Sequence, residues 1–330
     1  MHLCMKAEMG KKSQIVLSNG VEVSGAGRYL FDAQFFESEG THCISHAHSD
    51  HLPRKISRGE AVCSETTMRC INECTKHRIS KLSDPNIEMF DAGHMAGSCM
   101  FRLSIDDETI LYTGDFSTKN RFGIDGAKPH KTDILIMEST FGKPEYVFPS
   151  QDEMGAVIHD WVEDNLAQNV SVVLYSYPFG KSQDLLRILS DLDPLVDDSV
   201  SKATSSACPE LSFRKYSDEE DLKEPFVLIS RPYSKKKSME APWRRADMQT
   251  AAVSGWAMNP SYKYMAGVNE AFPLSDHAGF DELINFAEGC KPSLVLTHHG
   301  FATELAMEIR SRLGIDARPL VRGQCSIFDF

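Results

Sequence analysis

Three histidines and one aspartate fall within six consecutive positions of this chain, in the stretch His46-Ala47-His48-Ser49-Asp50-His51. The stretch follows a short apolar run that begins at His42, and this run predicts the end of a buried strand. If the chain is still extended there, His46 and His48 point to the same side, while Asp50 and His51 turn toward a second point. One short loop can therefore supply ligands to two metal ions about 3.5–4 Å apart. The alternative is a histidine-rich loop that binds no metal.

Polar side chains of the metal-ligating type recur where other apolar runs end and strands are predicted to stop. They are Asp32, His94, Asp115, Glu138, His277 and the pair His298 and His299. Rigid strands that present such groups along one edge provide the support that a catalytic or metal site needs. We therefore expect the groups to meet in one site.

These residue types suit zinc, which binds imidazole nitrogen and carboxylate oxygen and keeps a position open for water in catalytic sites. The first predicted site takes three histidines: His46, His48 and His94. The second takes one aspartate and two histidines: Asp50, His51 and His299. Asp115 is the natural bridging carboxylate, and Asp32 is expected to fix the tautomer of a histidine. We predict two Zn²⁺ ions, with Mn²⁺ possible because carboxylates are among the ligands.

Length and charge limit the classes of protein to which the chain can belong. Its 330 residues, 42% of them hydrophobic, suffice for one large domain or two. The formal net charge of −12 argues against a surface that binds nucleic acid everywhere, so any such site must be local. No apolar run is long enough for a transmembrane helix, and the first twelve residues do not resemble a signal peptide. Nine cysteines without a CxxC pair favour a reducing compartment, so we expect a cytoplasmic protein that does not act at a membrane.

Local patterns predict several elements. A hairpin is expected over Gln14–Val23, around the turn signal Ser18-Asn19-Gly20. Apolar spacing predicts one helix over Glu65–Ile79 and another over Ser150–Ala167, the second with a capping box formed by Ser150 and Glu153. From Lys143 to Gly267 the pattern is that of a separate α/β unit.

The ordered motifs resemble those of a known superfamily. The stretch HAHSDH, then Gly93-His94, then Gly114-Asp115, is similar to the metal-binding motifs of the metallo-β-lactamase superfamily. Glu138 in MESTFG, His277 in PLSDH and His299 in THHG resemble the additional motifs of its β-CASP nucleases. This resemblance implies an α/β fold, the metallo-β-lactamase αββα sandwich with an inserted α/β β-CASP cap domain. It divides the chain into a first metallo-β-lactamase part at 1–142, the cap at 143–267 and a return segment at 268–330.

The resemblance also implies a function. It makes the chain a metal-dependent nuclease that hydrolyses phosphodiester bonds of single-stranded DNA or RNA, with a hydroxide shared by two metal ions. His277 would be the general acid, Glu138 its partner, and Asp50 and Asp115 would complete the catalytic set. The motif TFGKPEYVFP, the tripeptide Ser254-Gly255-Trp256 and LSDHAGFDEL look most like the compact ligase-associated DNA exonucleases, also described as messenger-RNA 3′-end processing factors. That likeness implies exonucleolytic cutting. It also implies a DNA ligase or other repair or processing proteins as partners.

Within the group, two positions separate the branches. The Artemis-like repair branch usually has Asp at the position of Glu138 and a residue other than histidine at that of His299, and this chain departs from both. The ribonuclease branch shares Glu and His there, but its chains are longer. His298 is an extra histidine beside the motif one. We assign His299 because it directly precedes Gly300, as in the family.

Four lysines are candidate contacts for substrate phosphates: Lys181, Lys235, Lys236 and Lys237. Lys181 lies in Gly180-Lys181-Ser182, which is no Walker A motif because Tyr175 stands where that motif needs glycine. The segment still links a predicted strand to a helix start, where a phosphate can bind. Two other functions stay open from the residues, a small-molecule hydrolase of the same fold and a non-catalytic nucleic-acid-binding protein.

Overall fold

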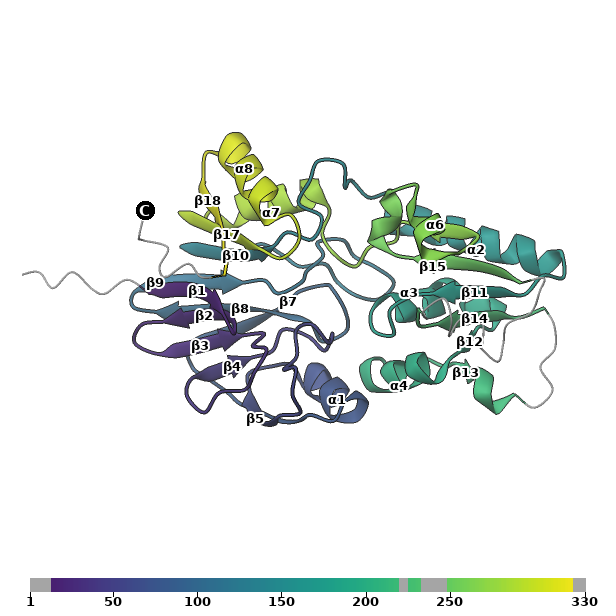
Figure 1. Cartoon of the computed structure of the whole chain (residues 1–330), viewed down its shortest axis with the longest axis horizontal. Helices are drawn as coiled ribbons and strands as arrows, with labels where there is room; N and C mark the ends of the chain where they lie inside the picture. The colour runs from purple at the N-terminus through teal and green to yellow at the C-terminus, as the bar shows by residue number, and fades with distance from the viewer. Residues whose placement is uncertain (1–12, 220–224, 233–247, 323–330) are drawn as a thin grey trace, which may run out of the picture.

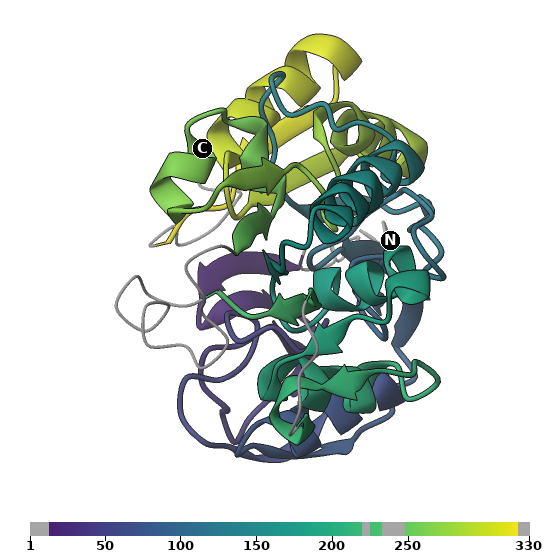
Figure 2. The ribbon, with the colours of Figure 1, turned by 90° about the vertical axis from the view of Figure 1, so that its right-hand side faces the viewer.

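Two α/β units lie side by side in the computed structural model (Figure 1), which describes residues 13–219, 225–232 and 248–322. The first unit combines the N-terminal and C-terminal parts of the chain, and the second is inserted between them. Figure 2, viewed from the side of the inserted unit, shows its teal and green elements in front of the purple N-terminal strands. Among the described helices, none combines the length and apolar character that a membrane span requires.

The first unit is built on two sheets packed face to face. The four-stranded sheet has the order β1 (Gln14–Ser18), β2 (Gly20–Ser24), β3 (Arg28–Phe31) and β4 (Thr41–Cys43). The six-stranded sheet has the order β18 (Asp316–Pro319), β17 (Leu294–His298), β10 (Ile134–Glu138), β9 (Glu108–Tyr112), β8 (Cys99–Ile105) and β7 (Ile87–Asp91). Side chains of both sheets share one buried cluster, including Ile15, Phe31, Phe101, Tyr112 and Ile136. Burial of these apolar faces holds the two sheets together.

Helices cover the outer faces of this sandwich. On the six-stranded sheet, α7 (Phe280–Cys290) and α8 (Ala302–Leu313) bury Phe286 and Leu305 against Leu135 and Val295. On the other side, α1 (Glu65–Cys74) packs beside the small sheet of β5 (Arg58–Ala61) and β6 (Arg78–Lys81). The layers are therefore helix, sheet, sheet, helix, which is the αββα sandwich expected from the motifs.

The inserted unit has its own six-stranded sheet, in which every described strand pair is parallel. Its strands, in sheet order, are β13 (Arg214–Lys215), β12 (Leu195–Val196), β14 (Val227–Ser230), β11 (Val172–Tyr175), β15 (Gln249–Val253) and β16 (Glu270–Phe272). Its longer helices are α2 (Gln151–Ala167), α3 (Lys181–Ile188) and α4 (Asp198–Ala207). Its short helices are η1 (Ser190–Leu192), η2 (Tyr216–Asp218), η3 (Gly255–Met258) and α6 (Tyr262–Ala266). Side chains from α2, α3 and α4 share a core with strands of this sheet, so this unit has a hydrophobic core of its own.

The expected end of the insertion at residue 267 precedes β16, which still pairs with β15 of the inserted sheet. We therefore propose to place the boundary after Phe272. The rest of the three-part domain division stays a prediction.

Two predicted elements are confirmed and one is wrong in its extent. The hairpin forms as β1 and β2, and Ser150 and Glu153 form the capping box at the start of α2. The helix predicted over 65–79 ends at Cys74. The Thr75 hydroxyl donates to the Ile71 carbonyl, and the Thr75 backbone is extended. Ile79 instead enters β6, where pairing with β5 replaces the helical turn that its spacing suggested.

Candidate active site

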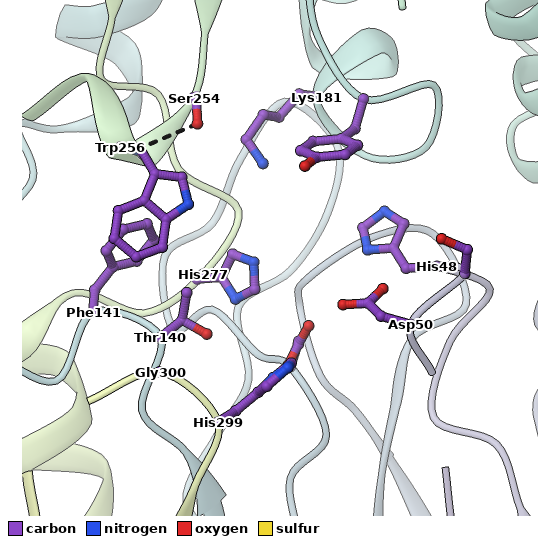
Figure 3. A pocket seen from close by; sticks show the side chains of 14 residues that line it. His48, Asp50, Thr140, Phe141, Lys181, Ser254, Trp256, His277, His299 and Gly300 are labelled. Atoms are coloured by element: carbon purple, nitrogen blue, oxygen red, sulfur yellow. Dashed lines mark hydrogen bonds and ion pairs between the residues drawn. The ribbon is translucent and has the colours of Figure 1, made fainter. Parts of the chain in front are cut away.

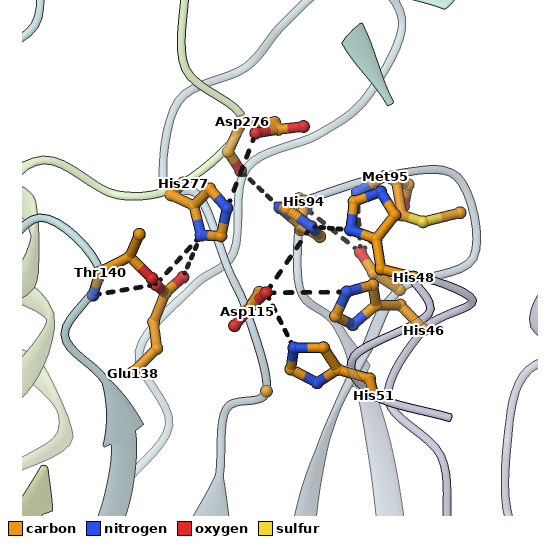
Figure 4. Close-up of polar contacts among 12 residues, drawn as sticks. His46, His48, His51, His94, Met95, Asp115, Glu138, Thr140, Asp276 and His277 are labelled. Atoms are coloured by element: carbon orange, nitrogen blue, oxygen red, sulfur yellow. Dashed lines mark hydrogen bonds and ion pairs between the residues drawn. The ribbon is translucent and has the colours of Figure 1, made fainter. Parts of the chain in front are cut away.

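Parallel strands of the six-stranded sheet bring the predicted ligands to one edge. Strand β10 lies between β9 and β17 and runs parallel to both, so the carboxyl ends of all three strands lie on the same side. Asp115 follows β9, Glu138 is the last residue of β10, and His299 follows β17. The loop of His46 to His51 follows β4 in the facing sheet and meets Asp115 there (Figure 4).

The predicted ligands form two groups of ligand-type atoms, and within each group the atoms lie within 4.8 Å of one another. The first contains His46, His48, His94 and Asp115, and the second contains Asp50, His51 and His299. His277 lies equally close to His94 and Asp276, and to Asp115 and Glu138. Asp115 connects the groups. Its Oδ2 is 3.7 Å from His46 Nε2 and 3.1 Å from His51 Nε2, and its Oδ1 is 3.5 Å from His299 Nδ1. All seven predicted metal ligands are therefore brought together, in the grouping expected from the sequence.

Of the two adjacent histidines, His299 faces Asp115 and His298 does not join either group. His298 is the last residue of β17 and stacks on Tyr112, with ring centroids 5.5 Å apart. Its burial lowers its pKa to about 4, so it stays neutral. The geometry thus agrees with the choice of His299.

Asp32 orients two of the histidines through hydrogen bonds. Its Oδ2 accepts a hydrogen bond from His51 Nδ1 at 2.8 Å and another from the Ser45 hydroxyl at 2.6 Å. That hydroxyl, having donated its own hydrogen, accepts from His46 Nδ1 at 2.9 Å. Tyr112 also donates to Asp32, at 2.8 Å. With hydrogen on both Nδ1 atoms, the Nε2 atoms of His46 and His51 present lone pairs to the site.

The other two histidines of the first group are oriented by backbone carbonyls. His94 Nδ1 donates to the carbonyl oxygen of Asp276 at 2.9 Å, and His48 Nε2 lies 3.4 Å from that of Phe179. Their remaining nitrogens, His94 Nε2 and His48 Nδ1, lie 3.0 Å apart. At this separation the two nitrogens can share one hydrogen, and a cation that lies near both lone pairs can take its place. The donor set therefore fits a metal ion.

Burial also keeps these ligands in the form that binds metal. Desolvation holds the pKa of His46 and that of His94 well below the usual value, so both rings stay neutral. The Nε2 atom of His46 is buried and has no hydrogen-bond partner among the described residues. Burial opposes the charge of Asp115, yet the neighbouring His51 and His299 hold its pKa well below the usual range. Neutral His46 and His94 beside an ionised Asp115 are the state that a divalent cation requires in the first group. Burial would lower the pKa of His51, but the carboxylates of Asp115 and Asp32 outweigh it and raise that pKa well above its usual value, so His51 must release a proton when a cation binds.

Replacing Asp32 with asparagine should weaken metal binding by about 10- to 100-fold, the usual effect of removing the partner of a ligating histidine. The variant Asp32→Asn keeps the shape of the side chain but puts an amide NH₂, which cannot accept a hydrogen bond, in place of one carboxylate oxygen. Competition for zinc with a chromogenic chelator measures the effect, and Asp107→Asn in an exposed turn is the matched control. Equal zinc affinity in Asp32→Asn and wild-type protein would show that Asp32 does not orient the ligands.

His277 and Glu138 form a pair beside the ligand groups. Nδ1 of His277 is 3.0 Å from each carboxylate oxygen of Glu138. Glu138 is fully buried and also accepts from the backbone N–H of Phe116 and the hydroxyl of Thr140. Burial alone would lower the pKa of His277, but the charge and hydrogen bond of Glu138 outweigh it and raise the pKa to about 9. His277 therefore carries a proton near neutral pH, as a general acid must.

Two buried ion pairs tie the inserted unit to the loops that hold this site. Lys181, the first residue of α3, pairs with Asp276, whose carbonyl orients His94. Asp184 of the same helix pairs with Arg121, which also donates to the carbonyl oxygen of His94. Since breaking a buried pair costs about 3–5 kcal/mol, these contacts fix α3 over the site.

A cleft of about 390 Å³ lies between the two units, over the ligand groups (Figure 3). The inserted unit contributes Tyr177, Lys181, Ser254, Gly255 and Trp256 to its walls. The first unit contributes His48, Ser49, Asp50, Asp115, Thr140, Phe141, His277, His299 and Gly300. The volume lies within the range of about 300–1,000 Å³ that is usual for ligand sites.

Of the four candidate substrate lysines, the structure describes Lys181. Lys181 lines the cleft, but it is 5% exposed and its charge is already balanced by Asp276. Its contact with a substrate phosphate stays a prediction. Lys235, Lys236 and Lys237 lie outside the described residues.

Sequence reasoning predicted the orienting role of Asp32 but missed the other groups that orient the ligands. Ser45 links Asp32 to His46 and Tyr112 donates to Asp32, and nothing in their local sequence marks them. Asp276 directly precedes His277 in the motif PLSDH, so its place in the motif was a usable signal.

Comparison with known proteins agrees with this architecture. No model of a known protein family matches the chain. It is 34% identical over 321 residues to a protein of Opitutus terrae named "Probable DNA ligase", a match that covers 92% of this chain and 30% of that one. It is 35% identical over 109 residues to cleavage and polyadenylation specificity factor subunit 3 of Dictyostelium discoideum, covering 32% of this chain and 14% of that one. The chain thus spans less than a third of either relative.

A solved structure shares the fold. The crystal structure of a protein of unknown function from Enterococcus faecalis V583 superposes with a TM-score of 0.59 at 12% identity, covering 87% of this chain and 94% of that one. Together with the αββα sandwich, its inserted α/β unit and the order of the motifs, these similarities show that the chain belongs to the β-CASP family of the metallo-β-lactamase superfamily.

Proposed function

We propose that this protein is a metal-dependent nuclease that hydrolyses phosphodiester bonds of DNA or RNA. The observation that carries the proposal is the placement of the His277–Glu138 pair beside two ligand groups that share Asp115. A hydrolase that relies on metal ions alone has no need of a protonated histidine in addition to the histidines that bind the metal. Cleavage of a phosphodiester gains from one, because the departing sugar oxygen is a poor leaving group and a positioned acid can give it a proton.

The ligand set supports two zinc ions. His46, His48 and His94 would hold one ion, Asp50, His51 and His299 the other, and Asp115 would contact both. When bound, such a pair of ions would supply a nucleophilic water at neutral pH and would offset negative charge on the phosphoryl group. Manganese suits the same mixture of imidazole and carboxylate ligands.

The residues of the chain would then divide the remaining tasks. His277 would donate the proton on its Nε2 to the leaving oxygen, while Nδ1 stays hydrogen-bonded to Glu138. Glu138 would keep the ring oriented and protonated, since its carboxylate is held by Phe116 and Thr140. Closure of the cleft by α3 would exclude bulk water, which strengthens each of these interactions.

The names of the relatives support nucleic acid as the substrate. One relative is named for a DNA ligase and another for cleavage and polyadenylation. We propose single-stranded DNA or RNA as the substrate, exonucleolytic cutting, and a DNA ligase or another repair or processing protein as a partner.

Matched DNA and RNA oligonucleotides, labelled at either end, test the proposal. We expect purified protein with zinc or manganese to release labelled nucleotides from at least one of them, because the site combines metal ligands with a proton donor. A chelator should abolish the reaction and added zinc should restore it. The released products report substrate, polarity and mode of cutting. If zinc-loaded protein cuts neither strand but hydrolyses a thioester, the small-molecule alternative is correct.

A further inference from the structure

Two large aromatic side chains of the inserted unit remain exposed at the walls of the cleft. Tyr177 is 58% exposed and Trp256 is 40% exposed, and both line the cleft together with His48 and His277. Exposed apolar surface of this size gains nothing for folding, since burial is what stabilises such rings. Neither the metal groups nor the proton donor uses these two rings.

Trp256 is held in place from behind. It lies in η3, where the Ser254 hydroxyl accepts from its backbone N–H, and its ring lies 4.8 Å from that of the buried Phe141. A second ring, Tyr146, is 5.9 Å away. A Cβ at Gly255 would lie only 2.5 Å from Phe141, so glycine is needed to bring Trp256 this close. The indole is therefore supported on one side and presented to the cleft on the other (Figure 3).

Tyr177 stands on a different wall, between β11 and α3. Its ring centroid is 6.2 Å from that of the ligand His48 and 5.7 Å from the ammonium of Lys181. Because Lys181 is buried and paired with Asp276, the cation beside the ring is fixed. The two aromatic rings thus lie near different parts of the site, Tyr177 beside His48 and Trp256 beside Phe141.

We propose that Tyr177 and Trp256 form a stacking subsite for two unpaired nucleobases on either side of the phosphate to be cut. The subsite rests on the proposed nuclease function. Aromatic rings accept any base by its π face, which a base in a duplex shares with its neighbours, so the subsite selects single strands. With a formal net charge of −12, attraction of phosphates to the protein surface is weak, and base contacts gain importance.

Binding of the zinc-loaded full chain to a fluorescent, phosphorothioate-linked single strand tests the subsite by anisotropy, since such linkages resist cutting. Tyr177→Ala and Trp256→Ala should each weaken binding by about 5- to 150-fold, the range for one base–aromatic stack. Tyr177→Phe and Trp256→Phe should keep most of the affinity. Phe35→Ala, which removes an exposed aromatic side chain that does not line the cleft, should leave binding unchanged.

The decisive control is the same strand with abasic residues, which keeps every phosphate and lacks the bases. On it, the alanine variants should bind as wild-type protein does. Equal losses on the intact and abasic strands, or no loss on the intact strand, would overturn the stacking subsite.

Cleavage of the unmodified strand by wild-type protein separates the two proposals. Binding without cleavage would overturn the nuclease function and leave the subsite standing. Cleavage combined with unaltered binding by both alanine variants would overturn the subsite alone, and an absence of binding would overturn both.

Discussion

Asp115→Ala is expected to bring the metal content below two ions per chain and to lower nucleic-acid cleavage by more than about 10³-fold. The loss should exceed the roughly 10- to 100-fold that follows removal of a ligand's hydrogen-bonding partner, because Asp115 is common to both ligand groups. Four histidines surround this carboxylate, and without it Asp50 would be the one carboxylate left in the two ligand groups. Elemental analysis after zinc loading and an oligonucleotide assay measure the two effects.

The matched control is Asp91→Ala. Asp91 also ends a strand of the same sheet, but it is exposed and belongs to neither ligand group. That variant should keep both metal ions and full activity. Retention of two ions by Asp115→Ala would show that the carboxylate is not a bridge.

His277→Ala should lower the rate of cleavage by about 10²–10⁴-fold, the usual contribution of a general acid. It should keep both metal ions and its affinity for the strand, because His94, whose ring lies 4.5 Å from that of His277, is oriented by the backbone carbonyl of Asp276. Metal analysis and single-turnover kinetics on one preparation measure both quantities. A fall to one ion per chain would identify His277 as a ligand instead.

Glu138→Gln tests the same assignment through the pH profile. The carboxylate of Glu138 is what raises the pKa of His277, so its removal should move the alkaline fall in rate to lower pH. The double variant His277→Ala with Glu138→Gln should lower the rate of cleavage little more than the worse of the two single changes, since the two residues act as a unit. An activated aryl phosphodiester, whose leaving group needs little protonation, should be much less affected by His277→Ala than an oligonucleotide. Equal losses on both substrates would contradict the role of proton donor.

Local sequence was sufficient for the features that depend on near neighbours. The turn at Ser18-Asn19-Gly20 and the capping box of Ser150 and Glu153 involve residues at most a few positions apart, and both form as expected. The six-residue stretch from His46 to His51 likewise indicates metal binding from its sequence alone. The order of the motifs predicted the fold. A resemblance to a known family that spans most of the chain also predicts which distant strands pair.

Only the tertiary structure decided which distant groups meet. The helix predicted to reach Ile79 ends early because Ile79 pairs with a residue of β5. The spacing of apolar residues along a helix contains no information about a strand elsewhere in the chain that can pair with it. Local sequence predicts a phosphate contact for Lys181 but gives no sign of its pairing with Asp276, 95 residues further along the chain. The exposure of Tyr177 and Trp256 is decided in the same way. An aromatic side chain is buried in the core or lines a cleft depending on which distant segments pack against it. Those segments cannot be identified from the residues next to it in the sequence.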